Sequence, residues 1–147
     1  MEVWTVGHST RTFDTFVDIL RKHRIEILAD VRHFPTSIRM PWFKREYLEL
    51  MLPKYRIRYV WMGDTLGGYR KGGYEAHLKS KEFHAGMRKL SDAALEGRTA
   101  VMCAESVFFR CHRRYIADAL AKDGWIVNHI YDQNRVERHE QEEPVTS

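Results

Sequence analysis

The stretch Thr99–Arg114, TAVMCAESVFFRCHRR, contains the change of pattern on which the fold prediction rests. It begins with the apolar run Ala100–Met102 and continues into two cysteines, a glutamate, a histidine and several arginines. An apolar run that gives way to polar residues is typical of a buried strand leading into a helix. In a parallel α/β sheet, the turn between such a strand and its helix lies at the carboxyl edge, where ligands bind. The pattern therefore predicts a site at this turn, and Ser106 is expected to cap the helix that follows.

The rest of the chain repeats the strand-and-helix pattern. The expected strands are Glu2–Val6, Ile25–Val31, Ile57–Met62, Thr99–Cys103 and Trp125–Ile130. The expected helices are Thr12–His23, Lys44–Leu52, a helix capped by Ser80 and ending near Glu96, and Val107–Lys122. Strands that alternate with helices predict a three-layer α/β/α sandwich with a mainly parallel five-stranded sheet.

The chain of 147 residues is expected to form a single α/β domain over residues 1–131. Residues 132–147 are rich in acidic side chains and poor in large apolar ones, so they are expected to form a disordered tail. No apolar run is long enough to cross a membrane, and the N-terminal residues do not resemble a secretory signal. Two cysteines cannot build a disulfide framework, so a reduced, cytoplasmic setting is expected.

The formal net charge of the whole chain is +4. Because the tail is acidic, the domain itself is more basic than this value suggests. A basic domain suits a partner that carries phosphate, although an ordinary solvated surface also explains the net charge by itself.

Polar residues recur where the predicted strands end. They are Gly7, His8 and Ser9; Asp30 and Arg32; Gly67 and Gly68; Cys103 and Glu105; and His129. Each is a weak signal alone, since a single histidine is often structural and an aspartate beside an arginine is often a plain ion pair. Their shared edge of a parallel sheet predicts one polar site.

Cys103 is a candidate nucleophile, because a helix N-terminus and nearby arginines lower the pKa of a thiol. The alternative is a small buried core thiol. The loop of cysteine-dependent phosphatases places an arginine six residues after its cysteine. Here that position is Phe109, and Arg110 comes one residue later, which excludes a standard phosphatase of this kind.

Cys103, Cys111 and His112 are an alternative set of metal ligands, with His8 as a further candidate. Their spacing matches no common zinc pattern, and the chain has no pair of cysteines separated by two residues. We therefore predict no metal and no cofactor.

Arginines and aromatic residues near the predicted site suit a phosphate-bearing partner. Arginine binds phosphate through two parallel hydrogen bonds, and the candidates are Arg32, Arg39, Arg110, Arg113 and Arg114. Aromatic side chains among basic residues suit stacking on a base, or else fill the core, and the candidates are Trp42, Phe43, Tyr69 and Tyr74.

Taken together and in order, these motifs resemble the family named domain of unknown function 488. The matching positions are Gly7-His8-Ser9, Asp30-Val31-Arg32, Pro35 and Ser37, Leu66-Gly67-Gly68, Cys103-Ala104-Glu105 and Cys111-His112-Arg113. One departure is Ser-Val-Phe-Phe between the two cysteine motifs, where the family often has a proline. The resemblance implies one shared polar site and leaves its chemistry open.

These observations favour an enzyme that acts on a phosphate-bearing small molecule or nucleic acid, with no membrane partner. The candidate catalytic residues are His8, Cys103, Glu105 and Asp30. The candidate substrate-binding residues are Ser9, Arg32, Ser37, Gly67, Gly68, His112 and Arg113. The alternative is a non-catalytic nucleic-acid-binding module that uses the same basic edge and the Gly-rich loop after the third strand.

Overall fold

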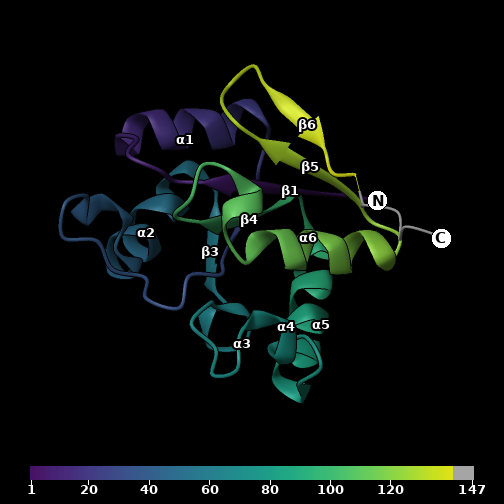
Figure 1. Cartoon of the computed structure of the whole chain (residues 1–147). Coiled ribbons are helices and arrows are strands. Elements are labelled where there is room, and N and C mark those ends of the chain that lie inside the picture. Colours follow the sequence, from purple (N-terminus) through teal and green to yellow (C-terminus); the bar gives the residue numbers. More distant parts are fainter. Residues whose placement is uncertain (141–147) are drawn as a thin grey trace.

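The computed structural model describes residues 1–140, and these contain one six-stranded sheet with the order β3-β2-β4-β1-β5-β6 (Figure 1). The strands are β1 (Glu2–Gly7), β2 (Ile27–Asp30), β3 (Arg58–Trp61), β4 (Thr99–Cys103), β5 (Ile126–Ile130) and β6 (Val136–Arg138). The first five are parallel, and β6 is antiparallel to β5. The carboxyl ends of five strands therefore share one edge.

Helices cover both faces of the sheet. They are α1 (Phe13–Lys22), α2 (Arg45–Met51), α3 (Gly63–Leu66), α4 (Tyr74–His77), α5 (Lys81–Glu96) and α6 (Arg113–Lys122), with 3₁₀ turns η1 (Pro41–Phe43), η2 (Leu52–Tyr55) and η3 (Phe108–Arg110). Helices α1 and α2 pack on one face, and α5 and α6 pack on the other. The predicted α/β fold class is confirmed, and the sheet has one strand more than predicted.

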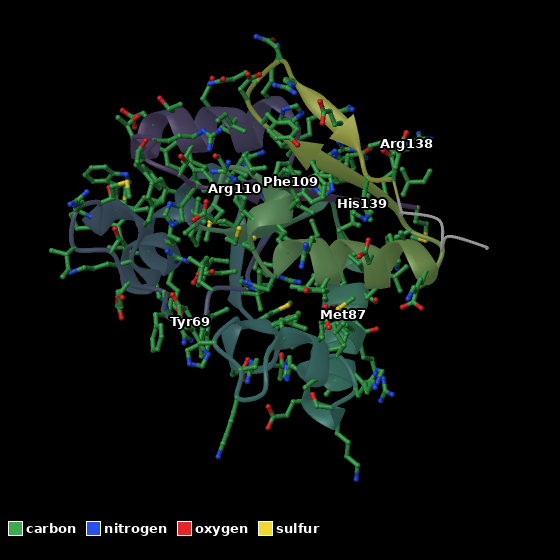
Figure 2. The ribbon with its side chains drawn as sticks, in the orientation of Figure 1. Tyr69, Met87, Phe109, Arg110, Arg138 and His139 are labelled. Carbon is green, nitrogen blue, oxygen red and sulfur yellow. The ribbon has the colours of Figure 1, made fainter. Side chains whose placement is uncertain are left out.

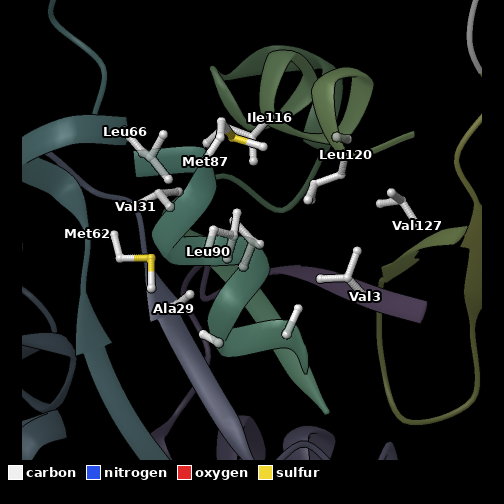
Figure 3. Packing of buried hydrophobic residues seen from close by; sticks show 14 of the residues in the cluster. Val3, Ala29, Val31, Met62, Leu66, Met87, Leu90, Ile116, Leu120 and Val127 are labelled. Carbon is white, nitrogen blue, oxygen red and sulfur yellow. The ribbon is translucent and has the colours of Figure 1, made fainter. Parts of the chain in front are cut away.

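The core between the sheet and helices α5 and α6 is aliphatic. Leu90 of α5 and Leu120 of α6 are fully buried and lie over Val3 and Val127 of the sheet (Figure 3). Burying side chains of this size stabilises the fold by roughly 1.5–3 kcal/mol each. This packing fixes the position of α6, whose first turn reaches the carboxyl edge of the sheet.

The helix predicted over Val107–Lys122 begins six residues later than expected, at Arg113. Ser106 does not cap it, because His112 occupies the N-cap position. Phe108 turns away and stacks on His129 with 3.7 Å between ring centroids, which holds η3 against β5. The segment 104–112 is therefore a turn that lies over the sheet edge.

The tail prediction is wrong for the segment that forms β6. Val136–Arg138 pairs with β5, and the next residue, His139, donates its backbone N–H to Val127 at 2.8 Å. The His139 side chain bridges His129 and Asp118, at 2.9 and 2.6 Å. Residues 141–147 of that prediction lie outside the described residues.

Candidate functional site

The end of β1 and the turn after β4 are held in close contact. Gly7 pairs with Cys103 in the parallel register. Beyond it, the N–H groups of His8 and Ser9 donate to the carbonyls of Cys103 and Ala104, both at 2.9 Å. A Cβ atom on Gly7 would lie 1.8 Å from the carbonyl oxygen of Glu105, so a larger residue cannot occupy this position without a backbone shift. The glycine thus brings His8 beside Cys103.

A cavity of about 750 Å³ opens at this edge of the sheet. It is lined by His8, Arg32, His33, Phe34, Thr36, Ser37, Met40, Gly68, Tyr69, Tyr74, Cys103, Ala104, Glu105, Phe109, Arg110, Cys111, His112, Arg114 and Tyr115. Figure 2 shows Phe109 and Arg110 on the turn after β4, and Tyr69 on the loop after α3. Four separate parts of the chain, after β1, after β2, after α3 and after β4, therefore build one cavity.

Most of the predicted site residues meet here. Those that line the cavity are His8, Arg32, Ser37, Gly68, Cys103, Glu105 and His112. The other predicted residues, Asp30, Ser9, Gly67 and Arg113, do not line it. Asp30 and Arg113 are both fully buried beside residues that do.

Asp30 and Arg32 form a buried ion pair behind the cavity. The guanidinium donates to both carboxylate oxygens, from Nε at 2.9 Å and from Nη2 at 2.7 Å, and the Arg32 backbone N–H adds a third bond at 3.0 Å. The hydroxyl of Tyr59 donates to the same carboxylate. Burial opposes the charge on Arg32, but Asp30 outweighs it, so the pKa of Arg32 is raised. The arginine is thereby fixed in one orientation.

His8 is a neutral imidazole whose second nitrogen faces Arg32. Its Nδ1 lies 2.8 Å from the carbonyl of Ser9, and because a carbonyl only accepts, Nδ1 carries the proton. Burial lowers the pKa of His8 from 6.5 to about 4, and the charge of Arg32 acts in the same direction. Its Nε2 therefore keeps a lone pair, which accepts from Nη1 of Arg32 at 3.4 Å. The ring is supported from behind by stacking on Phe43.

His112 forms part of another wall of the cavity. Its Nε2 donates to the carbonyl of Val31 at 2.8 Å, which leaves Nδ1 unprotonated in the neutral ring. Burial lowers the pKa of His112. A Cβ atom on Gly68 would lie 3.4 Å from this Nδ1, so the glycine backbone closes over the imidazole.

The two cysteines lie next to each other, with 3.1 Å between their sulfur atoms. Cys103 is buried and its Sγ also lies 3.5 Å from the carbonyl of Glu105, while Cys111 is partly exposed. The bond between the thiols, together with burial, raises the pKa of Cys103. The same bond lowers the pKa of Cys111 to about 7. Of the two sulfur atoms, Cys111 is therefore the one that ionises more readily, and Cys103 is the one that stays protonated.

Arg113 supplies positive charge beneath the two cysteines. Its backbone N–H donates to Sγ of Cys111 at 3.3 Å, and its Nη2 donates to the carbonyls of Glu105 and Ser106. The side chain is 1% exposed, yet its Nε and Nη1 have no hydrogen-bond partner within the described residues. It forms no ion pair with a carboxylate within residues 1–140. A buried cation without a carboxylate favours an anion nearby.

A comparison with protein-family models identifies the family of this chain. The family model described as domain of unknown function DUF488 matches residues 12–120. The chain belongs to this family. No curated protein and no solved structure matches it. The DUF488 match contains Arg32, both cysteines and Arg113, while Gly7-His8-Ser9 precedes it.

Several cavity residues of this DUF488 member were not predicted. His33 and Phe34 directly follow the Asp-Val-Arg motif, and Phe109 directly precedes Arg110, so adjacency to a motif was the available signal. From the sequence, Cys111 is a candidate metal ligand and a position of the family motif. Its contact with Cys103 depends on the η3 turn, which the sequence pattern did not reveal.

The Gly-rich loop of this DUF488 domain is held together by Arg70. Its guanidinium donates to the carbonyls of Gly67, Gly63 and Asp64, and it also lies 3.5 Å from Glu82. Arg70 does not line the cavity. Within this loop, Gly68, Tyr69 and Tyr74 provide the cavity lining instead.

Within residues 1–140, no three His, Cys, Asp or Glu side chains are grouped so that they could hold a metal ion, so the alternative ligand set of Cys103, Cys111 and His112 finds no geometric support. No helix in this part of the chain has the length and apolar character needed to span a bilayer.

Proposed function

We propose that this protein is an enzyme acting on a phosphate-bearing substrate, a nucleotide or a nucleic acid, in the cavity at the carboxyl edge. The proposal rests mainly on one observation: His8 is neutral, and its unprotonated Nε2 lies 3.4 Å from the fixed guanidinium of Arg32. A base beside an anion-binding group is the arrangement that proton transfer near a phosphate requires.

The charges around the cavity favour an anionic ligand. Its lining holds three arginines, Arg32, Arg110 and Arg114, against the single carboxylate of Glu105. Arg110 and Arg114 are exposed, so their guanidiniums are accessible to a phosphate group. Arg32 is largely satisfied by Asp30, and its Nη1 is the part that faces His8.

The cavity also presents aromatic surface. Phe34, Tyr69 and Phe109 are 61%, 85% and 56% exposed, which is unusual for side chains of this size. Phe34 and Tyr69 contact each other with 5.5 Å between ring centroids. Exposed rings beside arginines provide surfaces on which a base can stack. A ligand that combines a planar base with phosphate uses both features.

The proposed roles follow from these contacts. A bound phosphate replaces His8 as the partner of Nη1 of Arg32, and Nε2 of His8 then takes a proton from the attacking group, with Glu105 as the second acid or base. Asp30 orients Arg32 rather than touching the substrate. Cys103 forms a polar wall, because its sulfur atom is directed at Cys111 and at the Glu105 carbonyl.

A non-catalytic nucleic-acid-binding module is the second candidate. The exposed rings favour it, since single-stranded nucleic acid is bound by stacking platforms beside basic groups. The two candidates differ in turnover, while both require binding at the same cavity.

The test is to incubate the protein with nucleoside mono-, di- and triphosphates and with single-stranded oligonucleotides, and to follow products by chromatography. We expect turnover that falls by at least about 100-fold in His8→Gln, with binding retained. His84→Gln is the matched control, because His84 is exposed on α5 and outside the cavity. Binding without turnover by the wild type would favour the module, and neither binding nor turnover would reject both functions.

We also propose that the protein works in the cytoplasm. Both cysteines are free thiols, and a pair this close would be exposed to oxidation in a secreted protein. A reducing compartment keeps both sulfur atoms in the state described here.

A further inference from the structure

The Cys103–Cys111 pair has a property that the proposed function does not use. The sulfur atoms lie 3.1 Å apart, and a disulfide bond is about 2.05 Å long, so bond formation needs a movement of about 1 Å. Cys111 sits in extended backbone between η3 and α6, outside regular secondary structure. A small shift of this segment therefore brings the two atoms together without disturbing β4.

The surroundings distinguish the two cysteines. Cys111 accepts the backbone N–H of Arg113, which stabilises its sulfur as an anion, and it is partly exposed where Cys103 is buried, although both line the cavity. Cys103 is 2% exposed and is directed at the carbonyl of Glu105, an environment that favours a protonated thiol. The buried guanidinium of Arg113, with two nitrogens lacking hydrogen-bond partners among the described residues, supplies the balancing positive charge.

We propose that Cys103 and Cys111 form a reversible redox site, in which the Cys111 thiolate reacts with a peroxide and Cys103 resolves the product to an intramolecular disulfide. The lowered pKa of Cys111 supports this division of roles, because the thiolate is the reactive form. The proposal does not depend on the substrate of the cavity.

The disulfide forms in two steps. The Cys111 sulfur attacks one oxygen of hydrogen peroxide, the O–O bond breaks, and the departing hydroxide takes a proton to become water. This leaves a sulfenic acid on Cys111. The Cys103 sulfur then attacks the Cys111 sulfur, the S–O bond breaks, and the released hydroxide takes the Cys103 proton to leave as a second water. Two electrons pass from the cysteines to the peroxide, and a dithiol reductant returns them.

The test uses the full chain, whose two cysteines are its only ones, and hydrogen peroxide as the probe. At pH 7 we expect the wild type to lose both free thiols and the mass of two hydrogen atoms, with full recovery in dithiothreitol. Cys103→Ser should stop at a sulfenic acid on Cys111 that dimedone traps. Cys111→Ser should react with peroxide at least roughly tenfold more slowly than Cys103→Ser, because the buried Cys103 thiol that remains has little thiolate.

Several results would overturn the proposal. They are a wild type that keeps both thiols, a disulfide that links two chains instead of one, and a Cys111→Ser variant that reacts as fast as Cys103→Ser. Each is distinguishable by intact mass and by non-reducing electrophoresis.

The role of Arg113 is tested by the pH dependence of alkylation by iodoacetamide. We expect a midpoint near pH 7 in the wild type, as the pKa of Cys111 indicates, and a higher midpoint in Arg113→Met. Arg110→Met is the matched control, because Arg110 is an exposed arginine on the same turn. If Arg113→Met does not fold, the wild-type profile alone still tests whether the pKa of Cys111 is lowered. A midpoint near the ordinary thiol value of about 8.5 would contradict a lowered pKa.

Discussion

Arg32 is bound to Asp30 through two of its guanidinium nitrogens, while the third nitrogen, Nη1, faces Nε2 of His8. The carboxylate comes from the end of β2 and the imidazole from the residue after β1, two strands that are separated in the sheet by β4. One buried ion pair thus fixes the cation beside the proposed base. The contribution of this ion pair to the stability of the fold and the effect of the site on the protonation of His8 can both be measured.

Replacing Asp30 should destabilise the fold strongly. In Asp30→Asn the buried guanidinium of Arg32 loses its counter-charge, and breaking a buried pair in this way costs about 3–5 kcal/mol. Urea unfolding measures the loss. The control is Glu96→Gln, which breaks the exposed pair with Arg58 and should cost less than about 1 kcal/mol. Equal losses of unfolding free energy in the two variants would show that the buried ion pair stabilises the fold no more than the exposed pair does.

The pH dependence of stability should carry a contribution from His8. Its pKa is about 4 in the fold and 6.5 ordinarily, so the folded state favours the neutral ring. The unfolded chain then binds more protons between these values. The contribution of His8 to the free energy of unfolding is therefore fully present above about pH 6.5 and is lost as the pH falls toward 4.

Between pH 7 and pH 5 this contribution amounts to a loss on the order of 2 kcal/mol, which should be absent from His8→Gln. Urea unfolding of both proteins at the two pH values provides the comparison. His129, whose pKa burial lowers to about 3, adds a similar loss that both proteins share. An identical pH slope in the variant would mean that His8 is not held neutral by the fold.

Glu105 should affect function without affecting stability. Its side chain is exposed, and Arg113 binds its backbone carbonyl rather than its carboxylate. Glu105→Gln should therefore change the free energy of unfolding by less than about 0.5 kcal/mol. The same variant should lose turnover if the carboxylate moves a proton. A clear loss of stability at neutral pH would make Glu105 a structural residue.

Gly7 should tolerate no side chain. In Gly7→Ala the new Cβ would meet the Glu105 carbonyl at 1.8 Å, so either β1 or the turn after β4 must move, at a cost of about 3 kcal/mol. Gly97→Ala is the matched control, because its Cβ would lie 3.4 Å from the nearest atom, a side-chain carbon of Ile27. Thermal unfolding of both variants compares them, and a Gly7→Ala protein as stable as the control would refute the close contact.

The regular elements could be predicted from the sequence because local patterns determine them. The apolar run Thr99–Cys103 forms β4 with the predicted bounds, and Ser80 caps α5 by accepting from the N–H of Phe83. The convergence of His8, Arg32, Cys103 and Glu105 followed from the parallel sheet alone. These features depend on residues close in sequence or on strand direction.

The remaining features depend on contacts between distant residues. Phe108 leaves the predicted helix because it stacks on His129 of β5, and this delays the start of α6. The same turn places Cys111 against Cys103, which no spacing rule indicated. Strand β6 is short and exposed, so only its pairing with β5 identifies it.

The most direct test of the central claim is ligand binding by calorimetry at low salt, with a nucleoside monophosphate, inorganic phosphate and a single-stranded oligonucleotide as probes. We predict that the wild type binds at least one probe and that the Arg110→Ala/Arg114→Ala double variant binds it at least about tenfold more weakly. The control is Lys79→Ala/Lys81→Ala, which removes two exposed cations outside the cavity and should bind as the wild type does. No binding of any probe by the wild type, or equal binding by the arginine variant, would contradict the claim that this cavity takes a phosphate-bearing ligand.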